Sequence, residues 1–144
     1  MDFLKAQLTK ISKLKLVNLS KSTVLITGAD SGLGLEAACE ILLSKPERLI
    51  LAVRDIKKGN VANKELQNGM ILSLQIDVHK LDHSSFLPVH NFVKGLEGQR
   101  IDIAILNAGT WNTKFTTTTD MLLRLLKQQD NSLRAYLTNI IVSF

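Results

Sequence analysis

The sequence predicts a doubly wound α/β fold with a parallel sheet, and two observations support that prediction. Short apolar runs rich in Val, Ile and Leu alternate along the chain with amphipathic stretches of helical length. A glycine-rich segment, Thr27–Gly34, separates the first apolar run from the first helical stretch. Such alternation favours a parallel sheet with helices on its faces and right-handed crossovers between the strands.

The expected strands are buried runs, and the expected helices carry one apolar face each. Strands are predicted at residues 22–26, 48–53, 70–76 and 101–106. Helices are predicted at residues 33–44, 57–66 (with Gly59 as a weak point), 83–96 and 120–144. The apolar faces are assigned to Leu35, Cys39, Leu42 and Leu43 in the first helix, and to Phe86, Leu87, Val89, Phe92, Val93 and Leu96 in the third.

Composition indicates one globular domain. The chain has 144 residues, of which 45% are hydrophobic and 22% charged. Its one cysteine, Cys39, excludes an internal disulfide and is compatible with a reducing compartment, so a cytoplasmic location is expected. Cys39 is interpreted as a small core residue rather than a nucleophile. No apolar run approaches the roughly 20 residues that span a bilayer.

The net charge of +5 is concentrated in residues 1–20, which form a separate basic amphipathic segment before the domain of residues 21–144. This segment could touch an anionic membrane or target an organelle. A helix that lies on the domain is favoured, because a targeting peptide normally carries arginine and this segment has none. Nucleic-acid binding is not expected, since the single Trp and Tyr are remote from the lysines and no recognition motif is present.

The glycine-rich segment is typical of a phosphate-binding turn. Glycines allow the backbone to approach a pyrophosphate, and the N–H groups at the start of the next helix can hold it. A glycine-rich turn without a ligand is the alternative. Asn107–Gly109 follows the last predicted strand, at the carboxyl edge where ligands of open α/β sheets bind.

Three motifs together resemble the short-chain dehydrogenase/reductase family: Thr27-Gly28-x-x-x-Gly32-x-Gly34, Asp77-Val78 and Asn107-Ala108-Gly109. Several stretches are similar to fungal members related to retinol dehydrogenases. The resemblance implies a Rossmann-type, NAD(P)-binding domain over residues 21–144. The cofactor-binding residues that it implies are Gly28, Ser31, Gly32, Leu33, Gly34, Asn107, Ala108 and Gly109, with Asp77 and Val78 at the adenine. Asp77 could instead cap a turn.

The cofactor type is indicated by Arg54, which follows the second predicted strand about 20 residues after Gly34. A guanidinium pairs with a 2′-phosphate through charge and paired donors, which favours NADP over NAD. Asp55 could turn toward a ribose hydroxyl or hold Arg54. Lys57 and Lys58 add positive potential, although a solvated helix start would look the same.

The resemblance also implies a catalytic serine and a Tyr-x-x-x-Lys pair. The only tyrosine is Tyr136, and the residue four positions later is Ile140. We expect the missing groups beyond Phe144, so the chain is interpreted as truncated. Asn131 is the candidate for the family's proton relay, with Asn139 a weaker candidate and a polar helix kink the alternative. His79, His83 and His90 lack metal-ligand spacing, so no metal site is predicted.

These observations predict a function in two parts. The parent activity is NADP-dependent carbonyl reduction or alcohol oxidation on a small, apolar metabolite, as in fungal secondary metabolism. This chain alone is predicted to bind the cofactor without catalysing. The alternatives are a non-catalytic relic, a nucleotide-binding partner of an intact relative, and a membrane-surface protein. An apolar sheet edge at residues 101–106 suggests marginal stability and pairing, either as a homo-oligomer or with a relative.

Overall fold

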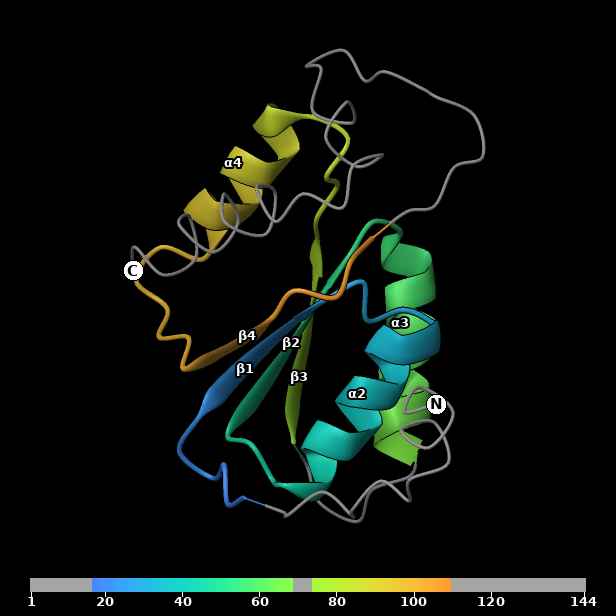
Figure 1. The fold of residues 1–144 in the computed structure, drawn as a ribbon, viewed down its shortest axis with the longest axis vertical. Coiled ribbons are helices and arrows are strands. Elements are labelled where there is room, and N and C mark those ends of the chain that lie inside the picture. The colour runs from blue at the N-terminus through green and yellow to red at the C-terminus, as the bar shows by residue number, and fades with distance from the viewer. Residues whose placement is uncertain (1–16, 69–73, 110–144) are drawn as a thin grey trace, which may run out of the picture.

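The computed structural model describes residues 17–68 and 74–109, which form one parallel sheet flanked by helices (Figure 1). The elements in chain order are β1 (Thr23–Thr27), α2 (Gly32–Leu43), β2 (Arg48–Val53), α3 (Ile56–Asn68), β3 (Gln75–Lys80), α4 (Phe86–Gly95) and β4 (Ile103–Ile105). The four strands lie in the order β3-β2-β1-β4. The chain therefore changes direction along the sheet between β3 and β4, and confirms the predicted doubly wound topology. Among the described residues, no helix is long and apolar enough to cross a membrane.

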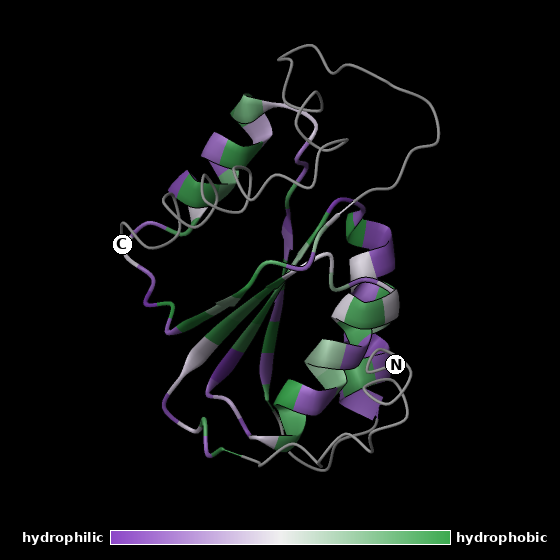
Figure 2. Ribbon diagram, viewed as in Figure 1, coloured by the Kyte–Doolittle hydropathy of each residue, from purple (hydrophilic) through white to green (hydrophobic). Residues whose placement is uncertain are grey.

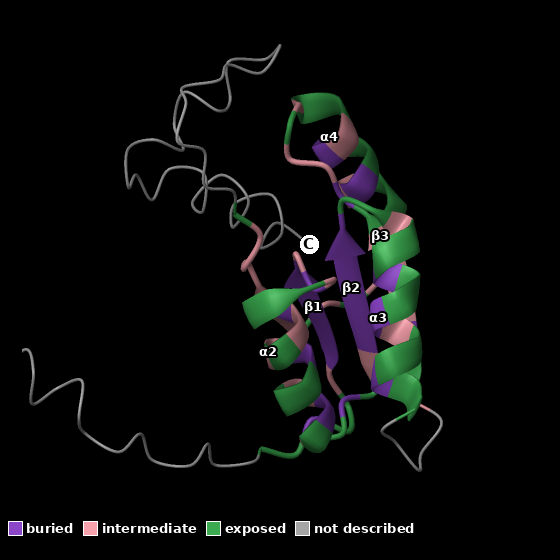
Figure 3. Ribbon diagram, turned by 90° about the vertical axis from the view of Figure 1, so that its right-hand side faces the viewer, coloured by how far each residue is buried: buried purple, intermediate pink, exposed green. Residues whose placement is uncertain are grey.

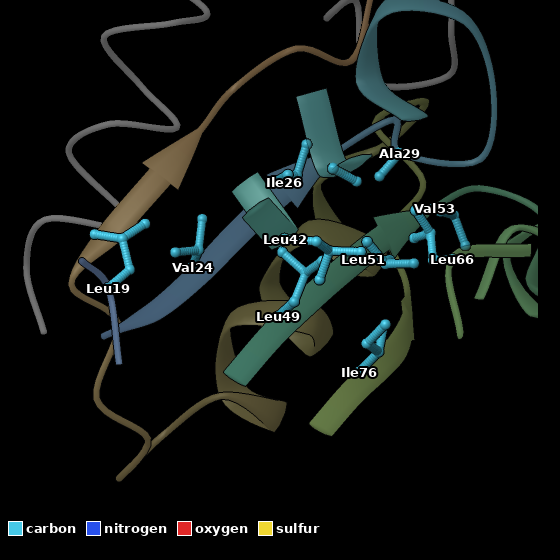
Figure 4. Packing of buried hydrophobic residues seen from close by; sticks show 11 residues of the cluster. Leu19, Val24, Ile26, Ala29, Leu42, Leu49, Leu51, Val53, Leu66 and Ile76 are labelled. Carbon is cyan, nitrogen blue, oxygen red and sulfur yellow. The ribbon is translucent and has the colours of Figure 1, made fainter. Parts of the chain in front are cut away.

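Helices α2 and α3 cover one face of the sheet and α4 covers the other (Figure 1). Every residue of β1 is buried, as are all residues of β2 except Arg48 (Figure 3). Alternate residues of β2 serve the two layers: Leu49, Leu51 and Val53 pack under α2 and α3, and Ile50 and Ala52 pack under α4. The apolar side chains of the first layer converge between the sheet and α2 (Figure 4). Hydropathy follows the same pattern, with polar residues on the outer helix surfaces (Figure 2).

The apolar face predicted for α2 is confirmed at Leu35 and Leu42, which pack in the core, and is wrong at Cys39 and Leu43. Cys39 is exposed and Leu43 is 57% exposed, whereas Gly34, Ala38 and Leu42 are buried. These three residues are spaced four apart, so they form one stripe along the helix. Gly34 brings α2 against the turn that precedes it, and this close contact fixes the rotation of the helix.

Strand β3 begins later than predicted, at Gln75, and residues 69–73 lie outside the described part of the chain. Asp77 and Val78 therefore lie inside the strand rather than after it. Parallel pairing with β2 sets the register, with Leu49 opposite Ile76 and Ile50 opposite Asp77. In the described part of the chain, β3 lies at an edge of the sheet and has a mixed burial pattern. Because it contains polar residues, the sequence pattern favoured the more apolar run before it as the strand.

Helix α4 begins at Phe86, not at residue 83. The Asp82 carboxylate accepts a hydrogen bond from the Ser84 N–H at 2.9 Å, which holds residues 82–84 in a turn before the helix. Val89, Phe92 and Leu96 are buried as predicted, and Val93 packs against them. Phe86 and Leu87 are instead exposed.

Strand β4 is shorter than predicted, and in the described part of the chain it forms one edge of the sheet. Two further hydrogen bonds join the residue before β4 to the first residue of β1. Asp102 accepts a hydrogen bond from the Thr23 N–H at 2.9 Å, and its own N–H donates to the Thr23 carbonyl at 3.0 Å.

Candidate nucleotide-binding site

The turn between β1 and α2 has a backbone that only glycine adopts without strain at two positions. Gly28 has φ +66° and Gly32 has φ +54°, both in the left-handed region. Ser31 occupies the N-cap position of α2, but its side chain makes no capping hydrogen bond. The first turn of α2 also contains no acidic residue. The N–H groups at the start of α2 are therefore not neutralised by the helix's own side chains, and they can receive an anion.

Gly34 and Gly28 also allow three segments to pack without side chains between them. A Cβ on Gly34 would overlap the carbonyl oxygen of Gly28 and lie 2.6 Å from Asn107 Nδ2. A Cβ on Gly28 would lie 3.0 Å from the Cα of Ala108. The turn, the first turn of α2 and the loop after β4 are thus in direct contact.

Asn107 ties the loop after β4 to the glycine turn. Its Nδ2 donates to the carbonyl oxygens of Thr27 and Gly28, both at 3.3 Å, and the Ala108 N–H donates to Thr27 Oγ1 at 3.0 Å. Thr27 is buried, so its hydroxyl is fixed by this contact. Thr27 belongs to the predicted motif, but its role was not predictable from the sequence, because its partner is 81 positions away in the chain.

A cavity of about 540 Å³ lies at the carboxyl ends of the strands. This volume is within the range usual for small-molecule sites. Its walls come from the glycine turn, the end of β2, the loop between β3 and α4, and the loop after β4. The lining residues are Gly28, Asp30, Ser31, Leu33, Ala52, Arg54, Lys58, Leu81, Asp82, His83, Ser84, Asn107, Ala108 and Gly109.

Most of the predicted cofactor-binding residues meet at this cavity. Gly28, Ser31, Leu33, Arg54, Asn107, Ala108 and Gly109 line it. Gly32 and Gly34 shape the turn beside it without being part of the lining. The candidate relay residue Asn131 and the weaker candidate Asn139 lie outside the described residues.

Asp77 and Val78 do not line the cavity, which corrects their predicted placement. The Asp77 carboxylate pairs with Arg48 Nε at 2.5 Å and accepts from Gln75 Nε2 at 3.0 Å. Val78 packs under α3 at Gly59. Asp82, five positions after Asp77, lines the cavity instead. Strand β3 ends at Lys80, later than the sequence predicted, and Asp82 is the first acid after that end.

Asp55 has a role that the sequence did not predict. Its Oδ1 accepts hydrogen bonds from the N–H groups of Lys57 at 2.8 Å and Lys58 at 3.4 Å. The carboxylate therefore caps the N-terminus of α3. Arg54 and Lys58 line the cavity, and Asp55 does not.

Replacing Asp55 tests this capping role. Asp55→Ala is expected to lower the free energy of unfolding by about 1 kcal/mol, because two N–H groups of α3 lose their acceptor. Asp55→Asn keeps the acceptor oxygen and is expected to remain close to wild type. Urea denaturation of both variants checks the prediction, and equal stability of Asp55→Ala and wild type would contradict it.

Two titratable residues in the loop before α4 have shifted pKa values. The backbone N–H and hydroxyl of Ser84 donate to the Asp82 carboxylate and lower its pKa, with a smaller contribution from Arg54. Burial lowers the pKa of His83, and the Asp82 charge opposes that shift. At neutral pH, therefore, Asp82 is charged and His83 is neutral. The described residues contain no group of three potential metal ligands.

Comparison with known proteins identifies relatives along most of the chain. The family model for short chain dehydrogenases matches residues 22–129. The chain is 38% identical over 120 residues to the short chain dehydrogenase opdN of Penicillium oxalicum, covering 82% of this chain and 38% of that protein. It is 42% identical over 95 residues to the short chain dehydrogenase resG of Aspergillus sclerotiorum, covering 65% and 26%. The chain thus spans little more than a third, or less, of the length of these relatives.

Solved structures share the fold. The bulky-bulky ketone specific alcohol dehydrogenase from Comamonas testosteroni is similar with a TM-score of 0.67 and 23% identity, over 86% of this chain and 49% of that one. A short-chain dehydrogenase from Sphingobium yanoikuyae in complex with NADPH is similar with a TM-score of 0.64 and 24% identity, over 85% and 46%. With the sequence match over residues 22–129, these findings show that the chain belongs to the short-chain dehydrogenase/reductase family, whose members bind NAD(P).

Proposed function

We propose that this chain is the nucleotide-binding part of an NADP-dependent oxidoreductase that interconverts a carbonyl and an alcohol on a small molecule. The observation that carries the proposal is the joining of a glycine turn and two cationic side chains, Arg54 and Lys58, in one cavity. The substrate class that we propose is a small, apolar metabolite.

The residues present fit a dinucleotide. Gly28 and Gly32 of the turn have no Cβ atoms, so a pyrophosphate can approach the backbone closely at these two positions. The N-terminus of α2 supplies N–H donors and a positive dipole end for that charge. The cavity extends from there in two directions, to Asn107–Gly109 after β4 and to Arg54 after β2.

We infer the preference for a cofactor with a 2′-phosphate from the charged side chains that lie near the end of β2. An acid at this position would accept hydrogen bonds from a ribose hydroxyl, but the Asp55 carboxylate is used by the α3 cap. Arg54 and Lys58 remain at the cavity, where they attract a phosphate. Two acids, Asp30 and Asp82, also line the cavity. Asp82 is held by Ser84, and no ion pair joins Arg54 to an acid in the described part of the chain.

The nicotinamide, when bound, supplies the hydride acceptor or donor. The residues of this chain bind and orient the nucleotide, and we propose Asn131 as a proton-relay residue. Tyr136 is not followed by a lysine four positions later. We therefore expect the 144-residue chain to bind NADPH without oxidising it when a ketone is added. Steady NADPH absorbance in that mixture checks this, and turnover would contradict it.

Charge reversal at Arg54 tests the cofactor preference. Arg54→Glu is expected to weaken NADPH binding by at least about tenfold, while NADH binding is unchanged or improves. Calorimetric titration of each cofactor into the full chain measures both affinities.

Lys57→Glu is the matched control, because Lys57 is exposed, carries the same charge and does not line the cavity. It is expected to keep the wild-type ratio of NADPH to NADH affinity. If Lys57→Glu and Arg54→Glu weaken NADPH binding equally, the assigned phosphate site is wrong. If neither cofactor binds the wild-type chain, the proposed function itself fails.

A further inference from the structure

His83 occupies an unusual place in the cavity wall. It lies with Asp82 and Ser84 in the loop between β3 and α4, and all three line the cavity. Its Nε2 atom has no contact with solvent and no hydrogen-bond partner among the described residues. A buried ring nitrogen without a hydrogen-bond partner destabilises the folded protein. A side chain with only a structural role would not require this loss of stability.

The charges that face His83 across the cavity are of both signs. Asp82 is its neighbour in the loop, Asp30 lies in the glycine turn, and Arg54 and Lys58 lie at β2 and α3. His79 is separate, because its ring packs on the edge of Phe92 from α4. Burial already keeps the pKa of His83 below its usual value, so the ring is neutral in solution at pH 7.

A bound nucleotide is expected to favour the protonated form of His83. The Nε2 atom of the ring is already shielded from solvent, so a ligand adds little further desolvation at that atom. The ligand does bring negative phosphates into the same cavity, and nearby negative charge favours the protonated form of an imidazole. We propose that His83 couples nucleotide binding to proton uptake, with one imidazole nitrogen taking a proton from solvent as an anionic nucleotide enters the cavity. No bond of the ligand changes in this step.

This inference rests on the proposed function, and linkage gives its sign. If binding takes up a proton, the affinity rises as the pH falls toward the usual pKa of histidine. The cavity would then bind nucleotide more tightly in a mildly acidic solution than in a neutral one. His83→Gln would remove the part of this pH dependence that comes from the imidazole and would keep a polar side chain in the wall.

Calorimetry of NADPH binding to the full chain, in buffers of different ionisation enthalpy near pH 6.5, measures the protons exchanged. Wild type is expected to take up more protons than His83→Gln, by up to about one per site. Subtracting the proton uptake of His83→Gln from that of wild type removes the contribution of the ligand's own phosphate, which titrates in the same pH range. His90→Gln is the control, because His90 is exposed on α4 and does not line the cavity. It is expected to match wild type.

Equal proton uptake in wild type and His83→Gln would overturn the inference while leaving the proposed function intact. Absence of NADPH binding to wild type would instead overturn the proposed function, and the inference with it. If His83→Gln does not fold, NMR titration of the His83 ring in wild type decides the matter. The pKa of His83 is expected to rise when NADPH is added, and an unchanged or lower pKa would contradict the coupling.

Discussion

Gly34→Ala is expected to abolish NADPH binding and to lower the free energy of unfolding by about 3 kcal/mol or more. The new Cβ would overlap the carbonyl oxygen of Gly28, a backbone atom that cannot rotate away, and would press on Asn107 Nδ2. The Asn107 hydrogen bonds to Thr27 and Gly28 would break with it. Urea denaturation and calorimetric titration of NADPH check the two effects.

The sign of the stability change makes this prediction specific. Glycine in a helix normally costs about 1 kcal/mol relative to alanine, so Gly→Ala without a clash stabilises. Gly95→Ala is the matched control, because Gly95 also lies in a helix and a Cβ there would have no neighbour within 4 Å. It is expected to leave stability unchanged or improved. A Gly34→Ala variant as stable as Gly95→Ala would refute the packing described for the turn.

Gly59→Ala is expected to lower the free energy of unfolding by about 1–3 kcal/mol, with a smaller effect on NADPH binding than Gly34→Ala. Its Cβ would lie 2.6 Å from a methyl group of Val53 and 2.6 Å from one of Val78. Both side chains are β-branched and held by the sheet, so α3 must move outward. Chemical denaturation measures the loss.

A double mutant separates this clash from a general helix effect. Val78→Ala removes the contact on the Val78 side and leaves the contact with Val53. The loss of stability caused by Gly59→Ala is therefore expected to be smaller in the Val78→Ala background. Strictly additive losses would show that the contact between α3 and β3 does not limit the substitution.

The sequence predicted those parts of the fold that local pattern determines. Strand β2 was predicted with its observed bounds, because it is buried on both faces and reads as a continuous apolar run. Strand β3 was misplaced, since an edge strand tolerates polar residues and its pairing with β2 is a long-range property. Cys39 was misassigned for a similar reason: the rotation of α2 depends on the contact of Gly34 with the turn, which the apolar pattern does not contain.

The parts of the site whose backbone is determined by a motif could be predicted from the sequence. The role of a carboxylate that has several possible partners could not. Gly28 and Asn107–Gly109 line the cavity, and Gly32 and Gly34 shape the turn beside it. The sequence could not decide among the roles of Asp55, because capping a helix and binding a hydroxyl use the same atoms. Asp82 and His83 were not proposed as cavity residues, since their place depends on where β3 ends. Gly59, interpreted as a weak point in its helix, is instead a point where α3 packs closely on the sheet.

The central claim is that four segments of the chain form one nucleotide site at the carboxyl edge of the sheet. Backbone-amide NMR of the full chain, titrated with 2′,5′-ADP, tests it most directly. Shifts are expected at Ser31 of the turn, at Leu33 in the first turn of α2, at Arg54 and at His83. Little change is expected around the ion pair between Arg48, at the start of β2, and Asp77 of β3. Shifts gathered around that ion pair, or no shifts at all, would contradict the account.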